Sequence, residues 1–161
     1  AKKRGVKVTC ETCPHYYTFT QDEVLVSGTN AKMNPPLRTE IDKQAIIKGL
    51  QDGTIDAIIT DHAPHSAEEK ERSLAAAPNG IIGFETALAA TITNLVEPGY
   101  ISYLDMVRLM SYNPAKLLKI DHERHRFDNI VDTTEISDIL IPSEFSCIKN
   151  QKNWTNTSNN W

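Results

Sequence analysis

The sequence predicts an α/β fold with parallel strands, and two observations indicate it. Short segments rich in β-forming residues alternate with segments whose apolar residues recur at helical spacing. Polar and titratable residues also follow directly after the expected strands. In parallel α/β folds, functional sites lie at the carboxyl ends of the strands. We therefore expect the chemistry of this chain in the loops that follow its strands.

The first half of the chain predicts one strand, a long irregular segment and one helix. Residues 6–10 alternate and are rich in β-formers, so we expect a strand there. Residues 14–33 are expected to be mostly irregular. A helix should begin after Thr39, an N-cap residue with Asp42 three positions on, and it should end at Gly53.

The second half predicts a buried strand followed by helices. Residues 55–60 are mainly apolar, as expected for a strand covered on both faces. A loop should run from there to Gly83. Apolar residues at helical spacing predict a helix over 84–96, another beginning after Ser102, and a short last helix over 113–119.

Composition restricts the class of protein. The 161 residues include 17 Lys+Arg and 21 Asp+Glu, for a net charge of −4, with 40% hydrophobic residues. These values exclude a disordered, collagen-like or disulfide-dense chain. No apolar run reaches the roughly 18 residues of a membrane span, and a pI near 5.7 disfavours nucleic acid as a partner. Three cysteines without a signal core indicate a cytoplasmic setting.

The composition also changes near residue 120. All seven glycines lie between Gly5 and Gly99, and residues 121–161 contain neither Gly nor Ala. We therefore treat residues 1–120 as one body. For residues 121–161 we expect a divergent or frame-shifted tail, with disorder as one alternative and a genuine but divergent tail as another.

The segment Thr60-Asp61-His62-Ala63-Pro64-His65 is the strongest local indication of chemistry. A carboxylate at the end of a buried strand, followed by two histidines, suits a metal-dependent hydrolase, because Asp both ligates a cation and takes a proton from bound water. The alternative is a strand-to-loop cap, in which Asp61 bonds local backbone and the histidines are exposed. Spacing alone leaves both interpretations open.

A second segment contains two cysteines and a histidine. His15 is a candidate ligand or base, but a hydrogen-bonded loop histidine is the favoured interpretation. Cys10 and Cys13 form a C-x-x-C pair. A zinc ribbon needs a second pair, which Cys147 alone cannot supply. A strand through Cys13 would also turn the two thiols to opposite faces, so a structural role is favoured.

Three further segments allow a functional and a plain interpretation. The two prolines after Asn34 form a rigid loop that presents its amide, or they form a plain turn. Around Asn79 and Gly80, backbone N–H groups face an anionic ligand, or the segment is a glycine-rich turn. The charged run over 68–72 is expected to be a solvated face.

Together, four segments in order give a specific resemblance. The segments are Glu-Thr-Cys-Pro-His-Tyr at 11–16, Asn-Pro-Pro-Leu-Arg at 34–38, Thr-Asp-His-Ala-Pro-His at 60–65 and Gly-Phe-Glu-Thr-Ala at 83–87. They closely resemble the dihydroorotases of the long bacterial type, in the amidohydrolase superfamily of metal-dependent TIM barrels. The resemblance covers about residues 1–120. It implies a partial TIM (β/α)8 barrel, about the last three βα units, and thus a C-terminal fragment.

Related enzymes remain as alternatives. Allantoinase and dihydropyrimidinase share the superfamily, but they tend to have Ser where this chain has Asn34, and they generally lack the second histidine, here His65. Both positions favour dihydroorotase. An alternative from another class is a non-catalytic dihydroorotase-like subunit that binds a partner such as aspartate carbamoyltransferase.

The resemblance implies an activity and a role for each matching residue. The activity is the reversible, zinc-dependent conversion of dihydroorotate and N-carbamoyl-L-aspartate in de novo pyrimidine biosynthesis, with one or two Zn²⁺ ions per intact site. Asp61 would ligate zinc, act as general base and return the proton to the leaving ring nitrogen. Asn34 and His65 would contact the substrate, and the backbone at Asn79 and Gly80 would hold the pyrimidine ring.

The resemblance also shows what this sequence lacks. The family's His-x-His pair, its mid-barrel carboxylate or carboxylated Lys and its two further His ligands have no counterpart here, and His15 matches none of them. We therefore expect the chain alone to be inactive, to bind zinc poorly and to fold badly. For the intact enzyme, a homodimer or an association with aspartate carbamoyltransferase is expected, with no nucleic-acid or membrane partner.

Overall fold

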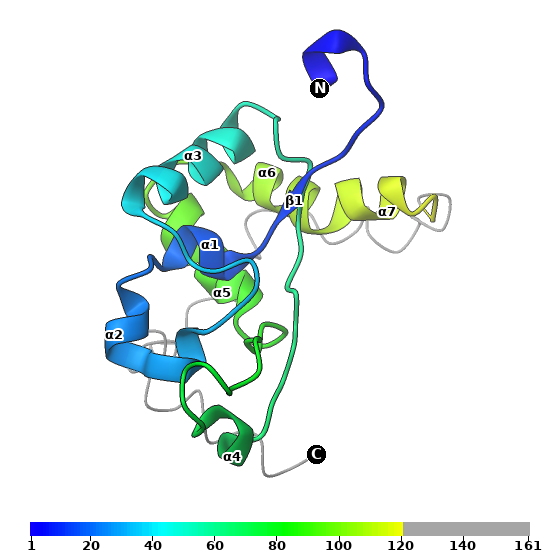
Figure 1. The fold of residues 1–161 in the computed structure, drawn as a ribbon. Helices are drawn as coiled ribbons and strands as arrows, with labels where there is room; N and C mark the ends of the chain where they lie inside the picture. The colour runs from blue at the N-terminus through cyan, green and yellow to red at the C-terminus, as the bar shows by residue number, and fades with distance from the viewer. Residues whose placement is uncertain (121–161) are drawn as a thin grey trace.

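The computed structural model describes residues 1–120 as short helices around a small sheet (Figure 1). The expectation for residues 121–161 lies outside the described residues. In chain order the elements are the 3-10 helix η1 (Lys2–Arg4), β1 (Glu11–Thr12), α1 (Pro14–Thr18), α2 (Glu23–Ser27), the 3-10 helix η2 (Gly28–Ala31), α3 (Glu40–Gln51), β2 (Ala57–Ile58), α4 (Ala67–Lys70), α5 (Ala87–Thr91), the π-helix η3 (Ile92–Val96), α6 (Tyr103–Val107), the π-helix η4 (Arg108–Tyr112) and α7 (Asn113–Leu117).

The two strands are parallel, which confirms the predicted α/β class. Glu11 pairs with Ala57 and Thr12 with Ile58. Beyond β2, His62 and Ile81 form one more parallel bridge. The carboxyl ends of both strands therefore lie together, and the loops that follow them meet on that side of the sheet.

The predicted strand over residues 6–10 is wrong. Only Glu11 and Thr12 pair, and the preceding segment is extended and exposed, with Val6 at 49% and Val8 at 45% of full exposure. The pairing register explains this, because it places residues 6–9 beside residues 52–55. That stretch is the turn that ends α3, so it offers no extended backbone with which to pair.

Three predicted helix starts are confirmed by the structure. The Thr39 hydroxyl accepts from the Asp42 N–H while the Asp42 carboxylate accepts from the Thr39 N–H, which forms the capping box of α3. The chain leaves this helix through Gly53, with φ 75°. Ser102 caps α6 in the same way, and α7 begins at Asn113 as expected.

Two segments expected as loops contain helices. Residues 14–33 hold α1, α2 and η2, and the loop before Gly83 holds α4. Helices of one or two turns are too short to show an apolar period. Their starts do have local signals: Pro14 occupies the first turn of α1, and Ser66 and Glu69 form a capping box for α4.

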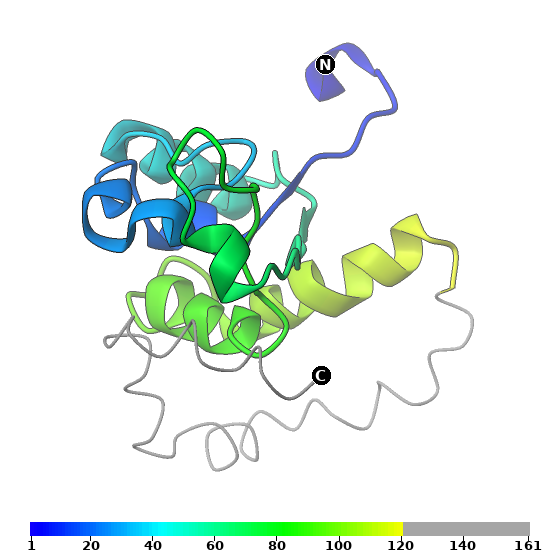
Figure 2. The same cartoon turned by 60° about the horizontal axis from the view of Figure 1, so that its bottom comes forward.

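The core divides into two clusters. In the larger cluster, buried side chains of α1 and α3 pack against those of the helices after residue 86. Figure 2 shows these later helices as a separate layer, in green and yellow. Its buried members are Tyr17, Ile47, Leu50, Ile55, Ile58, Ile92, Leu95, Ile101, Met106 and Leu109. The smaller cluster contains Ala31, Met33 and Leu37, and partly buried side chains of α1, α2 and the segment at Ile81 pack against it. Within the described part, no helix has both the length and the apolar character needed to cross a membrane.

Candidate active site

Asp61 lies at the point where the chain leaves the sheet. It follows β2 and has φ 48°, a left-handed backbone that Asp adopts more readily than most residues. The carboxylate is exposed rather than buried in the core. One oxygen of Asp61 lies in a group with a ligand atom of Cys13 and one of His15, all within 4.8 Å of one another.

The parallel pairing of the strands brings Cys13 and His15 to this place. Because Thr12 pairs with Ile58, the residue after β1 lies beside the end of β2. Cys13 is the N-cap of α1, and His15 is in its first turn. Sequence spacing does not connect these residues with Asp61, although Cys-Pro-His directly after a strand is the signal that could identify them.

Burial changes the proton affinity of both groups. Cys13 is 6% exposed and His15 is 5% exposed. Burial, with the Asp61 charge adding to it, raises the pKa of the Cys13 thiol to about 12. Burial lowers the pKa of His15 to about 4, against the opposing attraction of Asp61. At neutral pH the imidazole is therefore uncharged, which is the form that ligates metals.

His15 does not have the partners expected of a structural histidine. Its Nε2 atom is buried and has no hydrogen-bond partner within residues 1–120. Its ring contacts Tyr16 edge-on, with ring centroids 4.2 Å apart. The favoured interpretation, a hydrogen-bonded loop histidine, therefore fails for this nitrogen. The structural interpretation of the C-x-x-C pair agrees with the structure in one respect, since Cys10 is exposed, Cys13 is buried and both are free thiols.

His65 joins two of the predicted substrate segments. Its Nε2 lies 3.0 Å from the Asn79 carbonyl oxygen, and its Nδ1 lies 3.5 Å from the Glu69 carboxylate. Gly80 packs directly against the same loop: a Cβ at this position would lie 2.5 Å from the Ala63 carbonyl oxygen. The structure thus brings His65, Asn79 and Gly80 together.

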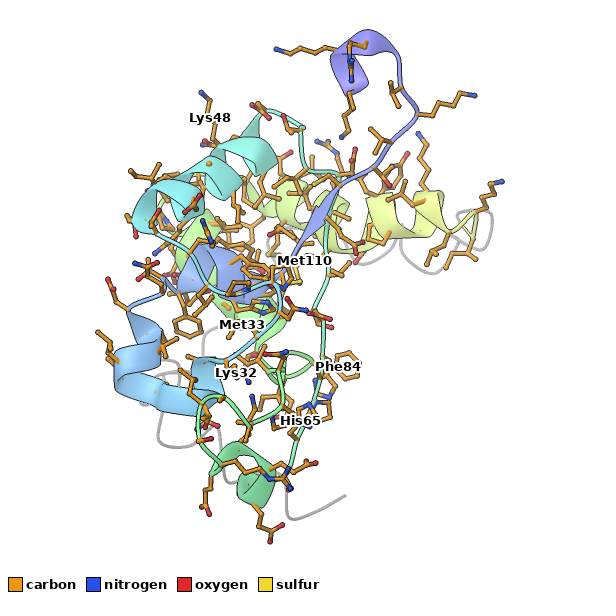
Figure 3. The ribbon with its side chains drawn as sticks, in the orientation of Figure 1. Lys32, Met33, Lys48, His65, Phe84 and Met110 are labelled. Carbon is orange, nitrogen blue, oxygen red and sulfur yellow. The ribbon has the colours of Figure 1, made fainter. Side chains whose placement is uncertain are left out.

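His62 links the same loop to the segment that begins α5. Its Nδ1 accepts from the Gly83 N–H at 3.0 Å, and its ring stacks on Phe84 at 4.0 Å. Figure 3 shows Phe84 and His65 along this side of the molecule. These contacts give His62 a structural role, fixing the end of β2 against the glycine segment.

Asn34 occupies a separate loop that contacts α1. The Tyr16 hydroxyl donates to the Pro35 carbonyl oxygen at 2.8 Å, and Met33 and Leu37 are buried on either side. Asn34 itself is exposed, so its amide is available to a ligand. The rigid presenting loop that the two prolines predict is consistent with these anchors.

Lys70 ties together three segments near the predicted substrate loops, which its sequence context did not indicate. We expected the run 68–72 to be a solvated face, which is wrong for Lys70: it is 8% exposed. Its ammonium donates to three carbonyl oxygens, those of Thr29 at 3.1 Å, Lys32 at 3.3 Å and Pro78 at 3.1 Å. Burial, helped by the nearby Lys32 charge, lowers the pKa of Lys70.

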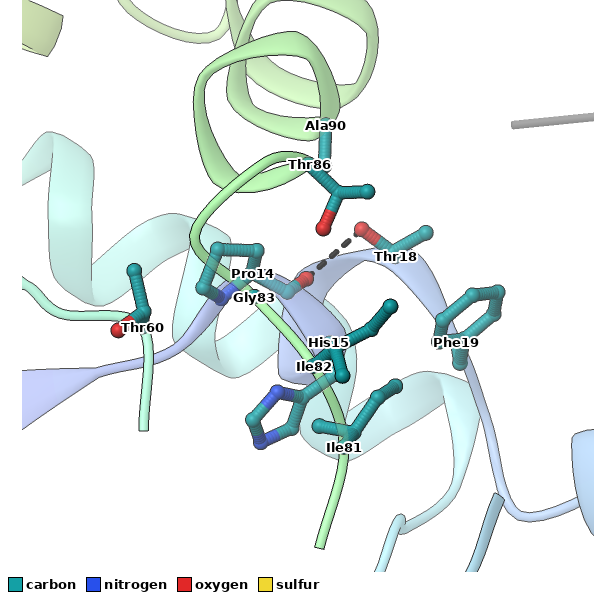
Figure 4. A pocket seen from close by; sticks show the side chains of 10 residues that line it. All are labelled: Pro14, His15, Thr18, Phe19, Thr60, Ile81, Ile82, Gly83, Thr86 and Ala90. Carbon is teal, nitrogen blue, oxygen red and sulfur yellow. Dashed lines mark hydrogen bonds between the residues drawn. The ribbon is translucent and has the colours of Figure 1, made fainter. Parts of the chain in front are cut away.

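A pocket opens beside His15 (Figure 4). Its walls are mainly apolar, and His15 is its one titratable side chain among the described residues. The Thr18 hydroxyl in its wall is already engaged, since it donates to the Pro14 carbonyl oxygen. The lining residues are Pro14, His15, Thr18, Phe19, Thr60, Ile81, Ile82, Gly83, Thr86 and Ala90.

Comparison with known proteins gives a consistent group of relatives. The chain is 57% identical over 121 residues to the dihydroorotase of Acetivibrio thermocellus, covering 75% of this chain and 28% of that protein. It is 54% identical over 141 residues to the dihydroorotase of Clostridioides difficile, covering 88% of this chain and 32% of that protein. For the dihydroorotase of Syntrophus aciditrophicus the match is 47% identical and spans all 161 residues and 35% of the relative. No protein-family model matches the sequence.

Solved structures give the same fold. The L-hydantoinase (dihydropyrimidinase) of Arthrobacter aurescens superposes with a TM-score of 0.71 at 34% identity, covering 74% of this chain and 27% of that one. The D-hydantoinase (dihydropyrimidinase) of a Thermus species superposes with a TM-score of 0.67 at 28% identity, covering 72% of this chain and 27% of that one. The chain therefore spans about a third of the length of the relatives it matches.

Proposed function

Because this chain belongs by sequence to the dihydroorotase family, we propose that it supplies part of the active site of such an enzyme. The observation that supports this most directly is the meeting of two loops after β2. One contains Asp61 and His65, and the other contains Asn79 and Gly80. Identities of 47–57% to dihydroorotases, against 28–34% to the two hydantoinases above, favour dihydroorotate over hydantoins as the substrate.

The proposed reaction opens the cyclic amide of dihydroorotate. Water adds through its oxygen to the ring carbonyl carbon, the carbon–nitrogen bond breaks, and the nitrogen takes a proton. We propose that Asp61 takes a proton from the attacking water and returns it to the leaving nitrogen. Its exposed position suits this exchange, since the carboxylate remains in contact with solvent.

A metal ion would supply the remaining chemistry. The carboxylate of Asp61, together with a ring nitrogen of buried His15, is a donor set suited to a divalent cation of the zinc type. When bound, such an ion polarises a carbonyl group and lowers the pKa of water. We propose zinc, one or two ions per intact site, with Asp61 as the ligand that this chain contributes in the family pattern.

Substrate recognition is divided between the loops. The exposed amide of Asn34 is free to contact the substrate carboxylate. Both nitrogens of His65 face groups of this chain, Asn79 and Glu69, so we propose that His65 acts first by holding the ring-binding segment. Gly80 allows the backbone to approach closely, because a side chain there has no space.

A chimera tests this proposal. In it, this chain replaces the aligned segment of the Acetivibrio thermocellus dihydroorotase. We expect the chimera to turn over dihydroorotate, and Asp61→Asn to reduce kcat by at least about a hundredfold. Asp22→Asn, an exposed carboxylate at the start of α2 without a cap bond, is the matched control and should leave kcat unchanged.

Two outcomes would contradict the proposal. One is a folded, metal-loaded chimera that is inactive toward dihydroorotate, which would favour the non-catalytic subunit. The other is a chimera that prefers allantoin or a hydantoin, which would favour the related cyclic amidohydrolases. The sequence spans about a third of its relatives, so association with a second copy or with aspartate carbamoyltransferase remains a proposal for the intact enzyme.

A further inference from the structure

The three side chains near the end of β2 offer three different donor atoms. The Cys13 sulfur, one His15 ring nitrogen and one Asp61 oxygen lie within 4.8 Å of one another. Ligand atoms of a tetrahedral zinc site lie roughly 3.5 Å apart, given bonds of about 2.0–2.3 Å. A small rotation of the side chains is therefore enough to place all three donors around one ion.

The histidine in this group is prepared for a ligand. His15 is only 5% exposed, and its Nε2 has no hydrogen-bond partner within the described residues. A buried polar nitrogen without a partner has lost its hydrogen bonds to water and destabilises the fold. A bond from a cation to this nitrogen would remove that penalty, whereas none of the neighbouring groups in the described part of the chain does so.

These observations lead to one inference: we propose that Cys13, His15 and Asp61 form a three-ligand site for a zinc-type divalent cation within this chain itself. One sulfur, one nitrogen and one carboxylate oxygen select Zn²⁺ or Co²⁺ over Mg²⁺ and Ca²⁺, which take oxygen ligands. Three protein ligands leave one tetrahedral position for water. The expectation of poor zinc binding counted Asp61 alone, and the geometry adds two ligands to it.

Charge and proton balance are consistent with this site. On binding, the Cys13 S–H bond breaks, its proton goes to solvent, and the sulfur bonds to the metal as a thiolate. The thiolate and the Asp61 carboxylate together neutralise the 2+ charge of the ion. His15 contributes a neutral nitrogen, so the occupied site has no net charge and tolerates its largely buried surroundings.

The test is a cobalt titration of the full 161-residue chain. The variant Cys10→Ser/Cys147→Ser leaves Cys13 as the sole thiol of the three cysteines. With one equivalent of Co²⁺ we expect the near-ultraviolet thiolate-to-cobalt absorption and the intense visible bands of a tetrahedral site, and we expect one equivalent of Zn²⁺ to abolish both. Lack of the thiolate band in this variant overturns the proposal.

Single substitutions in the same background assign the other ligands. His15→Gln and Asp61→Asn should each weaken Zn²⁺ binding more than about tenfold, measured by competition with a chromophoric chelator. His65→Gln, a histidine outside the cluster, should leave it unchanged. Equal affinity in the His15 and His65 variants would overturn the proposal. The chelator assay involves no dihydroorotate, so its result is separate from the outcome of the activity test.

Discussion

At the scale of single residues, His15 makes stability depend on pH. Its pKa is about 4 in the folded chain, against the ordinary value of 6.5 for a histidine in water. Between these values the unfolded chain binds a proton that the folded chain does not, so stability falls as pH decreases from about 6.5 to 4. We expect a loss on the order of 2 kcal/mol between pH 7 and pH 5.

Urea unfolding of the chain at both pH values, with a chelator present, measures this loss. His15→Gln removes the titrating group and should flatten the dependence. His65→Gln is the matched control, because its ring is half-buried and hydrogen-bonded to Asn79, and it should retain the dependence. An unchanged pH dependence in the His15 variant would show that another group causes it.

The sequence indicated single residues unevenly. Asp61 and His65 could be singled out because they follow an apolar strand, and Thr39 because Asp42 stands three positions on. The proximity of His15 to Asp61 could not be predicted in this way, because it arises from the register of two strands 46 positions apart, in which Glu11 pairs with Ala57. The burial of Lys70 could not be predicted either, because it depends on three carbonyl groups from other segments.

At the scale of elements, Gly80 determines how closely two loops approach. Its φ of 148° is unfavourable for other residues, and an added Cβ would overlap the Ala63 carbonyl oxygen. We expect Gly80→Ala to cost at least about 1 kcal/mol more than Gly53→Ala, as measured by thermal unfolding. Gly53 is the matched control because its φ is also positive, 75°, but its surroundings are open.

The same pair of variants separates packing from function in the chimera. Gly80→Ala should raise KM for dihydroorotate, since the loop with Asn79 is displaced from His65. Gly53→Ala, at the end of α3, should leave KM unchanged. If both variants had equal stability and equal KM, the close approach of these loops would have no importance for either property.

Element boundaries show where sequence patterns are informative. Capping residues located the starts of α3 and α6, because a cap is a local hydrogen bond between residues three apart. Strand lengths were overestimated, since the β-forming residues at 6–9 lie beside the turn that ends α3 and have no partner strand there. Apolar spacing predicted helical structure where η3 and η4 lie, but it gave no indication that these segments continue α5 and α6 as π-helices.

At the scale of the whole molecule, large apolar side chains remain on the surface. Leu25, Val26, Ile41 and Phe84 are among those exposed, and the two-stranded sheet has open edges in the described part. Such surface is typical of segments that pack against more protein. We predict that the purified chain gives no measurable turnover of dihydroorotate, whereas the chimera does.

A coupled assay for carbamoyl aspartate, run on the chain with added Zn²⁺, checks this prediction. The reason for the prediction is that the chain aligns with only about a third of each relative, and the resemblance implies that the intact site takes further ligands from outside this segment. Turnover by the isolated chain, lost in Asp61→Asn, would contradict the prediction and leave the assignment of Asp61 intact.

The buried ammonium of Lys70 has a consequence for motion. It bonds to Thr29, Lys32 and Pro78 at once, and the Gly80 N–H donates to the Lys32 carbonyl oxygen. These segments must therefore open together or remain closed together. Lys70→Met should let the Gly80 amide exchange with deuterium faster, by about tenfold for each 1.4 kcal/mol lost. The amide of Asp52, the C-cap residue of α3, should keep its rate. A ligand bound against Gly80 would then slow exchange in all three segments, although it touches only one.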